Sequence, residues 1–396
     1  METRPTKRVG VYHYSGFTHL RGGTLKTIRL LADAGYDVTV SLLPPRDGAP
    51  SHIEEQLPPN VTVRRVRLWT RVLPRFRGTS VKLLELMVRH VWHAWRSVFD
   101  LYVAIDPPAA LPVFLGTRFR RRKVVYLALE LFAEMPWVKG RPLWRLVDRY
   151  LCPRVDAIVT MDAYRAQHMV QQYKSRPPLT IRNTPPSRNV ERTRRLNEIL
   201  KSRGIDAEKI ALCVGNIEPG RNIETLIEAA QAFQQNVALV FMGWCEKDYF
   251  EKITAQIANL HLQHRVFIHP SVPPDEVWDF LGSAHVGLLV YRNLSLNYYY
   301  SAGASLRLYE YLMAGLPVVA PDFPGFPELV EGEGLGACVD PDDPLAIAEA
   351  VNTLVADEAE WNAMRNRAAE AAKDRYNWEI DGGKLLRLCE NLMANR

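Results

Sequence analysis

Cysteine is scarce in this sequence, and long apolar runs are missing. The five cysteines, Cys152, Cys213, Cys245, Cys338 and Cys389, lie far apart and form no CxxC pair, which argues against a disulfide framework or a zinc site and fits a reducing cytosol. No apolar run approaches the roughly 18 residues of a membrane-spanning helix. The start, METRPTKRVG, leads into a strand pattern without the apolar region of a signal peptide. We expect a cytoplasmic protein that is neither secreted nor membrane-spanning.

The sequence also has no fixed-period repeat and no low-complexity tract. Apolar residues make up 47 % and charged residues 24 % of the chain, which is close to the average of soluble globular proteins and excludes disordered, collagen-like and coiled-coil classes. The length of 396 residues suggests two domains, each with a substantial core.

Positive charge is concentrated in the first half of the chain. Residues 1–190 carry 31 Lys and Arg against 14 Asp and Glu, whereas the whole chain carries 50 against 44, a net charge of +6. The first half is therefore strongly basic and the second half acidic. A basic half can face nucleic acid, an anionic membrane or a phosphorylated substrate, and composition alone does not choose among them.

Short β-branched runs alternate with helix-period stretches along both halves. This alternation predicts an α/β fold with two doubly wound parallel sheets. Pro185 and Pro186, followed by a highly charged segment, indicate a domain boundary. We predict domains over 1–188 and 189–375 and a C-terminal helix over 376–396. The expected strands cover residues 8–14, 37–43, 62–68, 101–106, 123–129 and 156–162 in the first domain, and 211–216, 238–243, 265–269, 286–291 and 317–322 in the second.

The segment SLRLYEYLMAGLPVVAPDFPGFPELV, residues 305–330, carries the strongest functional signal. Ser305 suits a helix N-cap, and Gly315 suits the end of that helix. A helix that follows a parallel strand presents free amide groups at its N-terminus, which favour a phosphate. Arg307 can reach a phosphate oxygen and Glu310 can accept hydrogen bonds from ribose hydroxyls. The alternative is that both side chains belong to a solvated helix face.

This segment resembles the nucleotide-binding signature SPLKLxEYxAxGxPVVA of GT-B fold glycosyltransferases similar to glycosyltransferase family 4. Glu310 matches the second glutamate of the family's carboxylate pair, whereas Ala302 occupies the position of the first. A second stretch, ALCVGNIEPGRNIETLIEAA (211–230), resembles the family's VGRLxPxKGIxxLLEAF. Arg221 stands at the position of its lysine and Asn216 at that of its arginine. The family's cations neutralise the diphosphate on which charge develops as it leaves.

The resemblance extends to weaker positions. It implies that Gly243 follows the second strand of the donor domain, that His269 lies in the loop against the base, and that the last helix crosses back to the first domain. The first domain would then bind the acceptor and the second the nucleotide sugar, in a cleft between them. The donor-binding set implied is Asn216, Arg221, Gly243, His269, Ser305, Leu306, Arg307 and Glu310.

Glu130 is the best candidate for a catalytic or acceptor-orienting carboxylate. It follows an apolar strand, and the family often carries an acid there, after a histidine whose position Leu129 takes. The alternative is a helix-capping or interdomain salt-bridge glutamate. Gly22 and Gly23 allow close backbone approach to a phosphate or acceptor, although a tight turn is the more frequent explanation of a glycine pair. With Arg221, these residues form the predicted catalytic set.

No metal site or cofactor is expected. The DxD string of Asp340 and Asp342 precedes a helix, where N-capping is the better explanation. The histidines show no metal-ligand spacing. A nucleotide sugar of the UDP or GDP type would serve as co-substrate.

Residues 64–99 hold a basic amphipathic helix over 81–99. Leu84, Met87, Val91, Trp95 and Val98 share one stripe, and Lys82, Glu85, Arg89, His93 and Arg96 lie opposite. Such a helix can lie in an anionic membrane interface. The alternative is a helix that covers the sheet and has a basic outer face.

Together these observations predict a glycosyltransferase that moves a sugar to an acceptor hydroxyl with retention of configuration, in glycan, polysaccharide or glycolipid synthesis. Its partners would be a nucleotide sugar, a saccharide or lipid-linked acceptor and, at the periphery, the inner face of a membrane; no nucleic acid is expected. The alternative is a non-catalytic membrane- or nucleic-acid-binding protein with a degenerate nucleotide site. A GT-B epimerase or phosphorylase is a related third interpretation.

Overall fold

The computed structural model describes residues 7–15, 23–43, 57–71 and 79–394. The chain divides into two compact units, Met1–Asn183 with Asp381–Arg396, and Thr184–Ile380. The sequence prediction puts these borders at 188 and 375. Within the described part of the chain, no helix is both long enough and apolar enough to cross a membrane.

The first unit is built on a sheet of seven parallel strands in the order β3-β2-β1-β4-β5-β6-β7. The strand order reverses between β1 and β4, which places a topological switch point at their carboxyl ends. β4 and β5 are buried along their whole length because helices cover both faces of the sheet. The strands are β1 (Arg8–Tyr12), β2 (Asp37–Leu42), β3 (Val61–Arg65), β4 (Leu101–Ile105), β5 (Val124–Ala128), β6 (Ala157–Thr160) and β7 (Leu179–Thr180).

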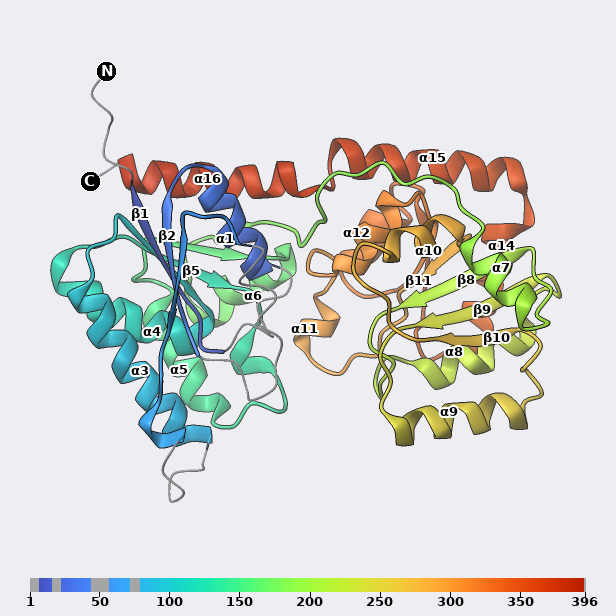
Figure 1. Ribbon diagram of the computed structural model, residues 1–396, viewed down its shortest axis with the longest axis horizontal. Coiled ribbons are helices and arrows are strands. Elements are labelled where there is room, and N and C mark those ends of the chain that lie inside the picture. The colour runs from blue at the N-terminus through green and yellow to red at the C-terminus, as the bar shows by residue number, and fades with distance from the viewer. Residues whose placement is uncertain (1–6, 16–22, 44–56, 72–78, 395–396) are drawn as a thin grey trace. The chain divides into compact units, whose positions relative to one another are not determined.

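Among the described residues, five α-helices and three short 3₁₀ turns connect these strands. The helices α3, α4 and α5 lie together beside the sheet, and α1 lies across from them (Figure 1). The helices are α1 (Gly23–Asp33), α3 (Thr79–Arg96), α4 (Asp106–Thr117), α5 (Arg141–Leu151) and α6 (Ala163–Tyr173); the turns are η2 (Trp69–Arg71), η4 (Arg118–Arg120) and η5 (Phe132–Glu134).

The second unit has six parallel strands in the order β10-β9-β8-β11-β12-β13. Its switch point lies between β8 and β11, so the loops that leave these two strands are where a doubly wound domain binds its ligand. The strands are β8 (Lys209–Val214), β9 (Val237–Met242), β10 (Val266–His269), β11 (Val286–Leu288), β12 (Val318–Pro321) and β13 (Gly336–Val339).

Two hydrophobic cores lie on the two faces of this second sheet. One packs helices α7, α10, α12 and α15 on strand residues such as Leu212 and Val240, and the other packs α8, α9 and α14 on the alternate residues Ala211 and Leu239. The helices are α7 (Arg195–Ser202), α8 (Ile223–Ala229), α9 (Lys247–Asn259), α10 (Val277–Ser283), α11 (Leu296–Tyr299), α12 (Leu306–Met313), α13 (Phe326–Val330), α14 (Pro344–Ala356) and α15 (Glu358–Asp374), with the 3₁₀ turn η6 (Ala230–Ala232).

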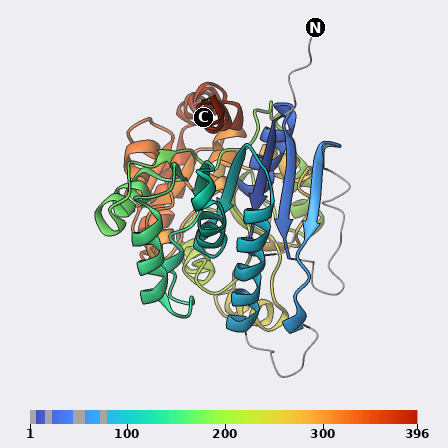
Figure 2. The same cartoon turned by 90° about the vertical axis from the view of Figure 1, so that its left-hand side faces the viewer.

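The last helix, α16 (Trp378–Ala394), contributes its residues from Asp381 onward to the first unit. Leu385, Cys389 and Met393 are buried at every fourth position, which is the spacing of one helix face. The sequence pattern predicts an apolar stripe of Leu385, Leu388, Leu392 and Met393; Leu385 and Met393 are buried, whereas Leu388 and Leu392 are only half-buried and Cys389 takes part instead. Figure 2 views α16 along its axis.

Candidate functional site

The loop after β8 supplies the predicted diphosphate cation. Gly215 (φ 144°) and Gly220 (φ 91°) turn the chain through backbone conformations that other residues rarely adopt. Arg221 follows, and its Nε lies 3.2 Å from Glu218 Oε1. The guanidinium also lies over the rings of Tyr291 (5.1 Å) and Tyr298 (5.6 Å). Three partners thus orient a cation whose side chain keeps 29 % of its surface exposed.

Helix α12 begins as the sequence predicts. Ser305 is its N-cap and accepts a hydrogen bond from the amide of Leu308, and Gly315 follows its end with φ 69°. Arg307 Nη1 forms an ion pair with Glu310 Oε2, one turn further on. Both side chains are largely covered, with 29 % and 13 % exposed, so they are not a freely solvated face.

Two buried tyrosines fix the start of α12 against the strands. The hydroxyl of Tyr311 accepts from the amide of Val214, at the end of β8 (2.9 Å), and donates to the carbonyl of Leu288, at the end of β11 (3.3 Å). Tyr309 donates to the carbonyl of Ala302 in the preceding loop (3.0 Å). These bonds hold the helix N-terminus at the switch point of the sheet.

The side chain of Tyr291 is the point where these predicted residues meet. Burial raises the pKa of the Tyr291 hydroxyl, while Arg221, a hydrogen bond with Ser305 and Arg307 act against that rise. Burial likewise raises the pKa of Cys213 to about 11, against the two arginines. Arg221 and Arg307 therefore act on the same two groups, beside the N-terminus of α12. The two arginines, each paired with a glutamate, and the N-terminus of α12 form a hydrogen-bond-donating surface that suits an anion.

The remaining donor-side predictions fall on the neighbouring strand ends. Asn216 is exposed on the loop after β8. His269 ends β10; its Nδ1 donates to the carbonyl of Pro270 (2.7 Å) and its ring packs 4.8 Å from that of Phe280. Leu306 opens α12. The aromatic segment 291–303 contains the short helix α11, and its Tyr291 and Tyr298 rings meet edge to face.

Gly243 has a packing role that the sequence does not reveal. A Cβ atom at this position would lie 1.6 Å from the carbonyl oxygen of Gly215. The end of β9 and the loop after β8 thus approach so closely that only glycine fits. Packing therefore explains why position 243 is a glycine, and the donor contact at Gly243 stays a prediction.

In the first unit, Glu130 follows β5 as predicted and is held by a buried arginine. Arg165 Nη1 contacts Glu130 Oε2 at 3.2 Å and the carbonyl of Leu129 at 2.7 Å. The Arg165 side chain is 3 % exposed, whereas that of Glu130 is 45 % exposed. One carboxylate oxygen is thus anchored while the group remains accessible. The carboxylate of Glu134, in contrast, is largely covered: it pairs with Arg145 (2.6 Å) and accepts a hydrogen bond from the Tyr173 hydroxyl (2.8 Å).

Asp106 is a buried carboxyl group at this edge that the sequence analysis missed. It follows β4 at the switch point, and its φ of 58° is unusual for a residue other than glycine. Its Oδ1 accepts hydrogen bonds from the amides of Leu129 (3.2 Å) and Glu130 (3.4 Å). Asp106 thereby fixes the backbone that carries Glu130. Burial, followed by the charge of Glu130, raises the pKa of Asp106 to about 8.

Replacing Asp106 by asparagine should change how stability depends on pH. The folded carboxyl, whose pKa is about 8, stays protonated up to that pH, whereas in the unfolded chain it ionises near pH 4. Its contribution to the free energy of unfolding is therefore fully present below about pH 4 and is lost as the pH rises to about 8. The asparagine side chain of the D106N variant would keep the Oδ1 acceptor, tolerates a positive φ and does not ionise.

We expect the unfolding free energy of D106N to exceed that of the wild type by at least about 1 kcal/mol at pH 8, and the two to agree within about 0.5 kcal/mol at pH 4. Urea unfolding at both pH values measures this difference. D106L is the control that removes the acceptor as well and should be destabilised at both. Equal pH profiles for D106N and wild type would contradict the prediction.

The other predicted residues divide between described and undescribed segments. Gly23 opens α1, where a Cβ would meet the methyl group of Met161 at 2.4 Å; Gly22 lies outside the described residues. Asp342 pairs with Arg292 (2.8 Å), and the N-cap of α14 is the next residue, Asp343. The described residues contain no group of three or more His, Cys, Asp and Glu side chains arranged to hold a metal ion.

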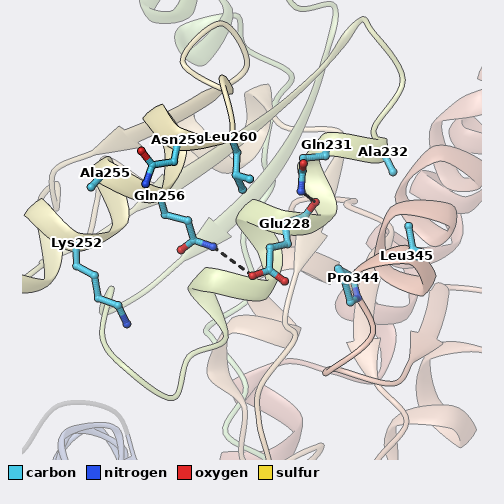
Figure 3. Close-up of a pocket in the computed structure, with 10 residues that line it drawn as sticks. All are labelled: Glu228, Gln231, Ala232, Lys252, Ala255, Gln256, Asn259, Leu260, Pro344 and Leu345. Atoms are coloured by element: carbon cyan, nitrogen blue, oxygen red, sulfur yellow. Dashed lines mark hydrogen bonds between the residues drawn. The ribbon is translucent and has the colours of Figure 1, made fainter.

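A surface groove of about 800 Å³ lies apart from these residues, between η6, α9 and the start of α14 (Figure 3). Gln256 donates to Glu228 at 3.4 Å on its wall, and Lys252 is paired with Glu224 at 2.9 Å. None of the predicted site residues lines it. The candidate site is therefore the group of Arg221, Tyr291, Ser305 and Arg307 at the switch point of the second sheet, and not this groove.

Comparison with known proteins shows what the chain is similar to. Residues 197–375, all within the second unit, match the family described as Glycosyl transferases group 1. Solved structures with the same fold include sucrose-phosphate synthase from Thermosynechococcus elongatus (TM-score 0.74, 18 % identity, 98 % of this chain and 100 % of that one). They also include Anabaena HepE in complex with UDP and glucose (TM-score 0.74, 17 % identity, 97 % and 100 %). The predicted fold class, two Rossmann-like domains of the GT-B type, is confirmed.

Two curated relatives match a little under half of this chain. The chain is 26 % identical over 179 residues to the D-inositol 3-phosphate glycosyltransferase of Xylanimonas cellulosilytica, covering 45 % of this chain and 41 % of that protein. It is 26 % identical over 188 residues to the GDP-mannose-dependent alpha-(1-6)-phosphatidylinositol monomannoside mannosyltransferase of Mycolicibacterium smegmatis, covering 47 % and 48 %. The chain thus matches about half the length of these relatives. The family match and the names confirm the predicted resemblance and support a transferase enzyme.

Proposed function

We propose that this protein transfers a sugar from a nucleoside diphosphate sugar to an acceptor hydroxyl. The observation that carries the proposal is the meeting of Arg221, Arg307 and the Ser305 cap around Tyr291, at the switch point of the second sheet. Ligands of doubly wound domains bind at this place, and the group gathered there suits a diphosphate.

In this proposal Arg221 and the N-terminus of α12, from Ser305 to Arg307, hold the two phosphates. Glu310, whose carboxylate also pairs with Arg307, accepts from the ribose hydroxyls. Asn216 adds a neutral donor. One curated relative and one solved structure support the donor type. The relative is GDP-mannose-dependent by name, and the solved structure is a complex with UDP and glucose. We therefore propose a UDP- or GDP-sugar.

We propose that the reaction retains the configuration at the anomeric carbon. The bond from this carbon to the diphosphate oxygen breaks, and the acceptor oxygen forms its new bond on the same face. The acceptor proton passes to the departing phosphate oxygen. The positive groups at Arg221 and α12 stabilise the charge that develops on the leaving group. Glu130 orients the acceptor hydroxyl, and Arg165 and Asp106 fix its position.

The acceptor we propose is a saccharide or lipid-linked saccharide of glycan or glycolipid synthesis. The names of two relatives include a D-inositol 3-phosphate and a phosphatidylinositol monomannoside, and both compounds are anionic. The basic first half suits such an acceptor. We also propose a cytoplasmic protein that associates peripherally with the inner face of a membrane.

Thermal unfolding with UDP, GDP, ADP and dTDP tests the donor site. A nucleotide at about a hundred times its dissociation constant stabilises the folded state by roughly 2.7 kcal/mol, so UDP or GDP should raise Tm by several degrees. A donor screen with mass-spectrometric detection of the released nucleotide then identifies the sugar. A Tm that none of the four nucleotides shifts, together with no turnover of any nucleotide sugar, would falsify the proposal. Turnover that requires free phosphate instead of an acceptor would indicate a phosphorylase.

A further inference from the structure

Helix α3 has two apolar faces, only one of which is buried. Leu86, His90 and Ala94 are the positions that pack inward, each about 1 % exposed or less. On the opposite side, Leu84 (62 % exposed), Val88 (61 %), Trp92 (51 %) and Trp95 (49 %) follow one another at helical spacing in solvent. The sequence analysis assigns Leu84, Met87, Val91, Trp95 and Val98 to a single stripe. The structure splits that set, because Leu84, Trp95 and Val98 are exposed while Met87 and Val91 are half-buried.

The exposed face continues from α3 onto the end of α4. The two helices pack so closely at Gly116 that a Cβ there would lie 2.5 Å from the carbonyl of Val91. Turn η4 follows α4 directly, and its Phe119 is 87 % exposed. Arg120 of this turn lies over the ring of Trp95 at 5.3 Å. The exposed apolar residues of α3 and Phe119 therefore belong to one surface.

Arginines accompany this apolar surface. Arg96 lies over Trp92 at 4.9 Å, and Arg118 over Phe119 at 5.8 Å. Residues 80–123 contain eight Lys and Arg against three Asp and Glu, and one of the three, Asp106, is buried. Arg89 is neutralised by Glu85 at 2.7 Å, so the uncompensated charge is carried mainly by Arg96 and η4.

Exposed apolar side chains of this size are concentrated in the first unit. Among the described residues, thirteen of the seventeen exposed large hydrophobic side chains lie in the first unit and four in the second. Scattered exposure is normal on a protein surface, whereas a contiguous apolar patch marks an interaction site. The pattern of this patch, tryptophan beside arginine on a helix lying along the surface, suits the boundary between lipid headgroups and acyl chains.

We propose that the face formed by Leu84, Val88, Trp92, Trp95 and Phe119, with Arg96, Arg118 and Arg120, docks on an anionic lipid bilayer. The apolar side chains enter the headgroup region while the arginines pair with anionic headgroups. An anionic bilayer is the occupant that the charge favours, because the patch is both apolar and strongly positive. A second copy of the chain is disfavoured as the occupant, because it would place the arginines of both copies next to one another.

This inference names the surface behind the proposed peripheral association. It does not require catalysis, because vesicle binding is measured without donor or acceptor. A failure to bind vesicles would leave the nucleotide-dependent Tm shift intact, and a failure of that shift would leave vesicle binding intact.

The test is sedimentation of the full chain with phosphatidylcholine vesicles that contain either no phosphatidylglycerol or about 30 % of it. We expect the chain to sediment only with the anionic vesicles. Salt at about 0.5 M should release the part of the binding that depends on charge. R96E/R120E should bind at least about 10-fold more weakly, since one Lys or Arg near the surface contributes about a factor of five. W92A/W95A should also bind at least about 10-fold more weakly, because it removes two of the apolar side chains that enter the headgroup region. K201E/K373E and F250A/L345A make matched changes on exposed residues of the second unit and should bind as the wild type does.

Each variant is compared with the wild type by thermal unfolding and by its Tm shift with UDP or GDP. The altered side chains are exposed, so both measurements should remain unchanged. Binding of R96E/R120E and W92A/W95A equal to that of the wild type would overturn the proposal. So would a wild-type chain that ignores anionic vesicles, or one that forms a dimer in sedimentation velocity which W92A/W95A abolishes.

Discussion

Replacing Arg221 by alanine is expected to lower kcat/KM for the nucleotide sugar by about 10²–10³-fold, the usual effect of removing one donor to a developing negative charge. Arg221 is held by Glu218, Tyr291 and Tyr298 before any ligand arrives, so its charge is positioned without reorganisation. The alanine variant loses this charge while the second unit keeps its core, because the side chain contributes to neither hydrophobic cluster. Steady-state kinetics with the donor identified in the screen measures the effect.

Two further variants make this experiment specific. R221K keeps the charge but loses the planar group that lies over the two tyrosines, so it should retain part of the activity. K252A removes an exposed lysine of the same unit that pairs with Glu224 and should leave kcat/KM within about twofold. Activity of R221A within about threefold of the wild type, at unchanged Tm, would remove Arg221 from the donor site.

The Gly243→Ala variant is expected to lose at least about 3 kcal/mol of stability in the second unit. The new Cβ would lie 1.6 Å from the carbonyl oxygen of Gly215 and 2.7 Å from its carbonyl carbon. Both atoms are backbone atoms, so no flexible side chain can move aside. Relief requires β9 to separate from the loop after β8, which breaks the bond from the Gly215 amide to the Met242 carbonyl. Urea unfolding with far-UV circular dichroism measures the loss.

The same chemical change at Gly383 is the control. This glycine lies inside α16, and its added Cβ would meet only Arg387 Nη1, at 3.5 Å. G383A should be neutral or more stable by about 0.5–1 kcal/mol, because alanine favours a helix. If G243A folds with normal stability but loses its Tm shift with nucleotide, the glycine serves the ligand and not the packing.

Most of the fold could be predicted because its strands are short, buried and β-branched. The runs at 101–106 and 123–129 became β4 and β5, which are buried on both faces and therefore apolar at every position. The two strands that were missed, β7 and β13, lie at sheet edges and have less apolar sequence. β7 has only two residues, and β13 begins at a glycine with φ 157°. Neither shows the pattern of a central strand.

The positions of the residues predicted for the donor site could be read from the sequence because these residues occupy short motifs. Ser305, Arg307 and Glu310 are separated by at most a helical turn and a half, and Arg221 follows a glycine turn. The role of Tyr291 was not predictable, because it depends on the distance between loops that are seventy residues apart in sequence. Asp106 could have been found by the reasoning applied to Glu130, since it also follows a fully apolar strand. Its burial and positive φ needed the structure.

The face of α3 shows where periodicity gives no answer. The helix is apolar on two sides, so the spacing of its leucines and tryptophans fits either side against the sheet. The close approach at Gly116 decides it, because it brings the Ala94 side of the helix against α4 and leaves Trp92 and Trp95 outside. A predicted single stripe therefore became a packing face and a separate exposed face.

The position of α16 has a consequence for how the chain is made. Leu385 and Cys389 are buried and belong to the first unit, although they follow the whole second unit in sequence. A domain that is synthesised first often folds while the rest of the chain is still on the ribosome. Here the residues of α16 that belong to the first unit are synthesised only after every residue of the second unit. The first unit can therefore be completed only once the whole second unit has been made.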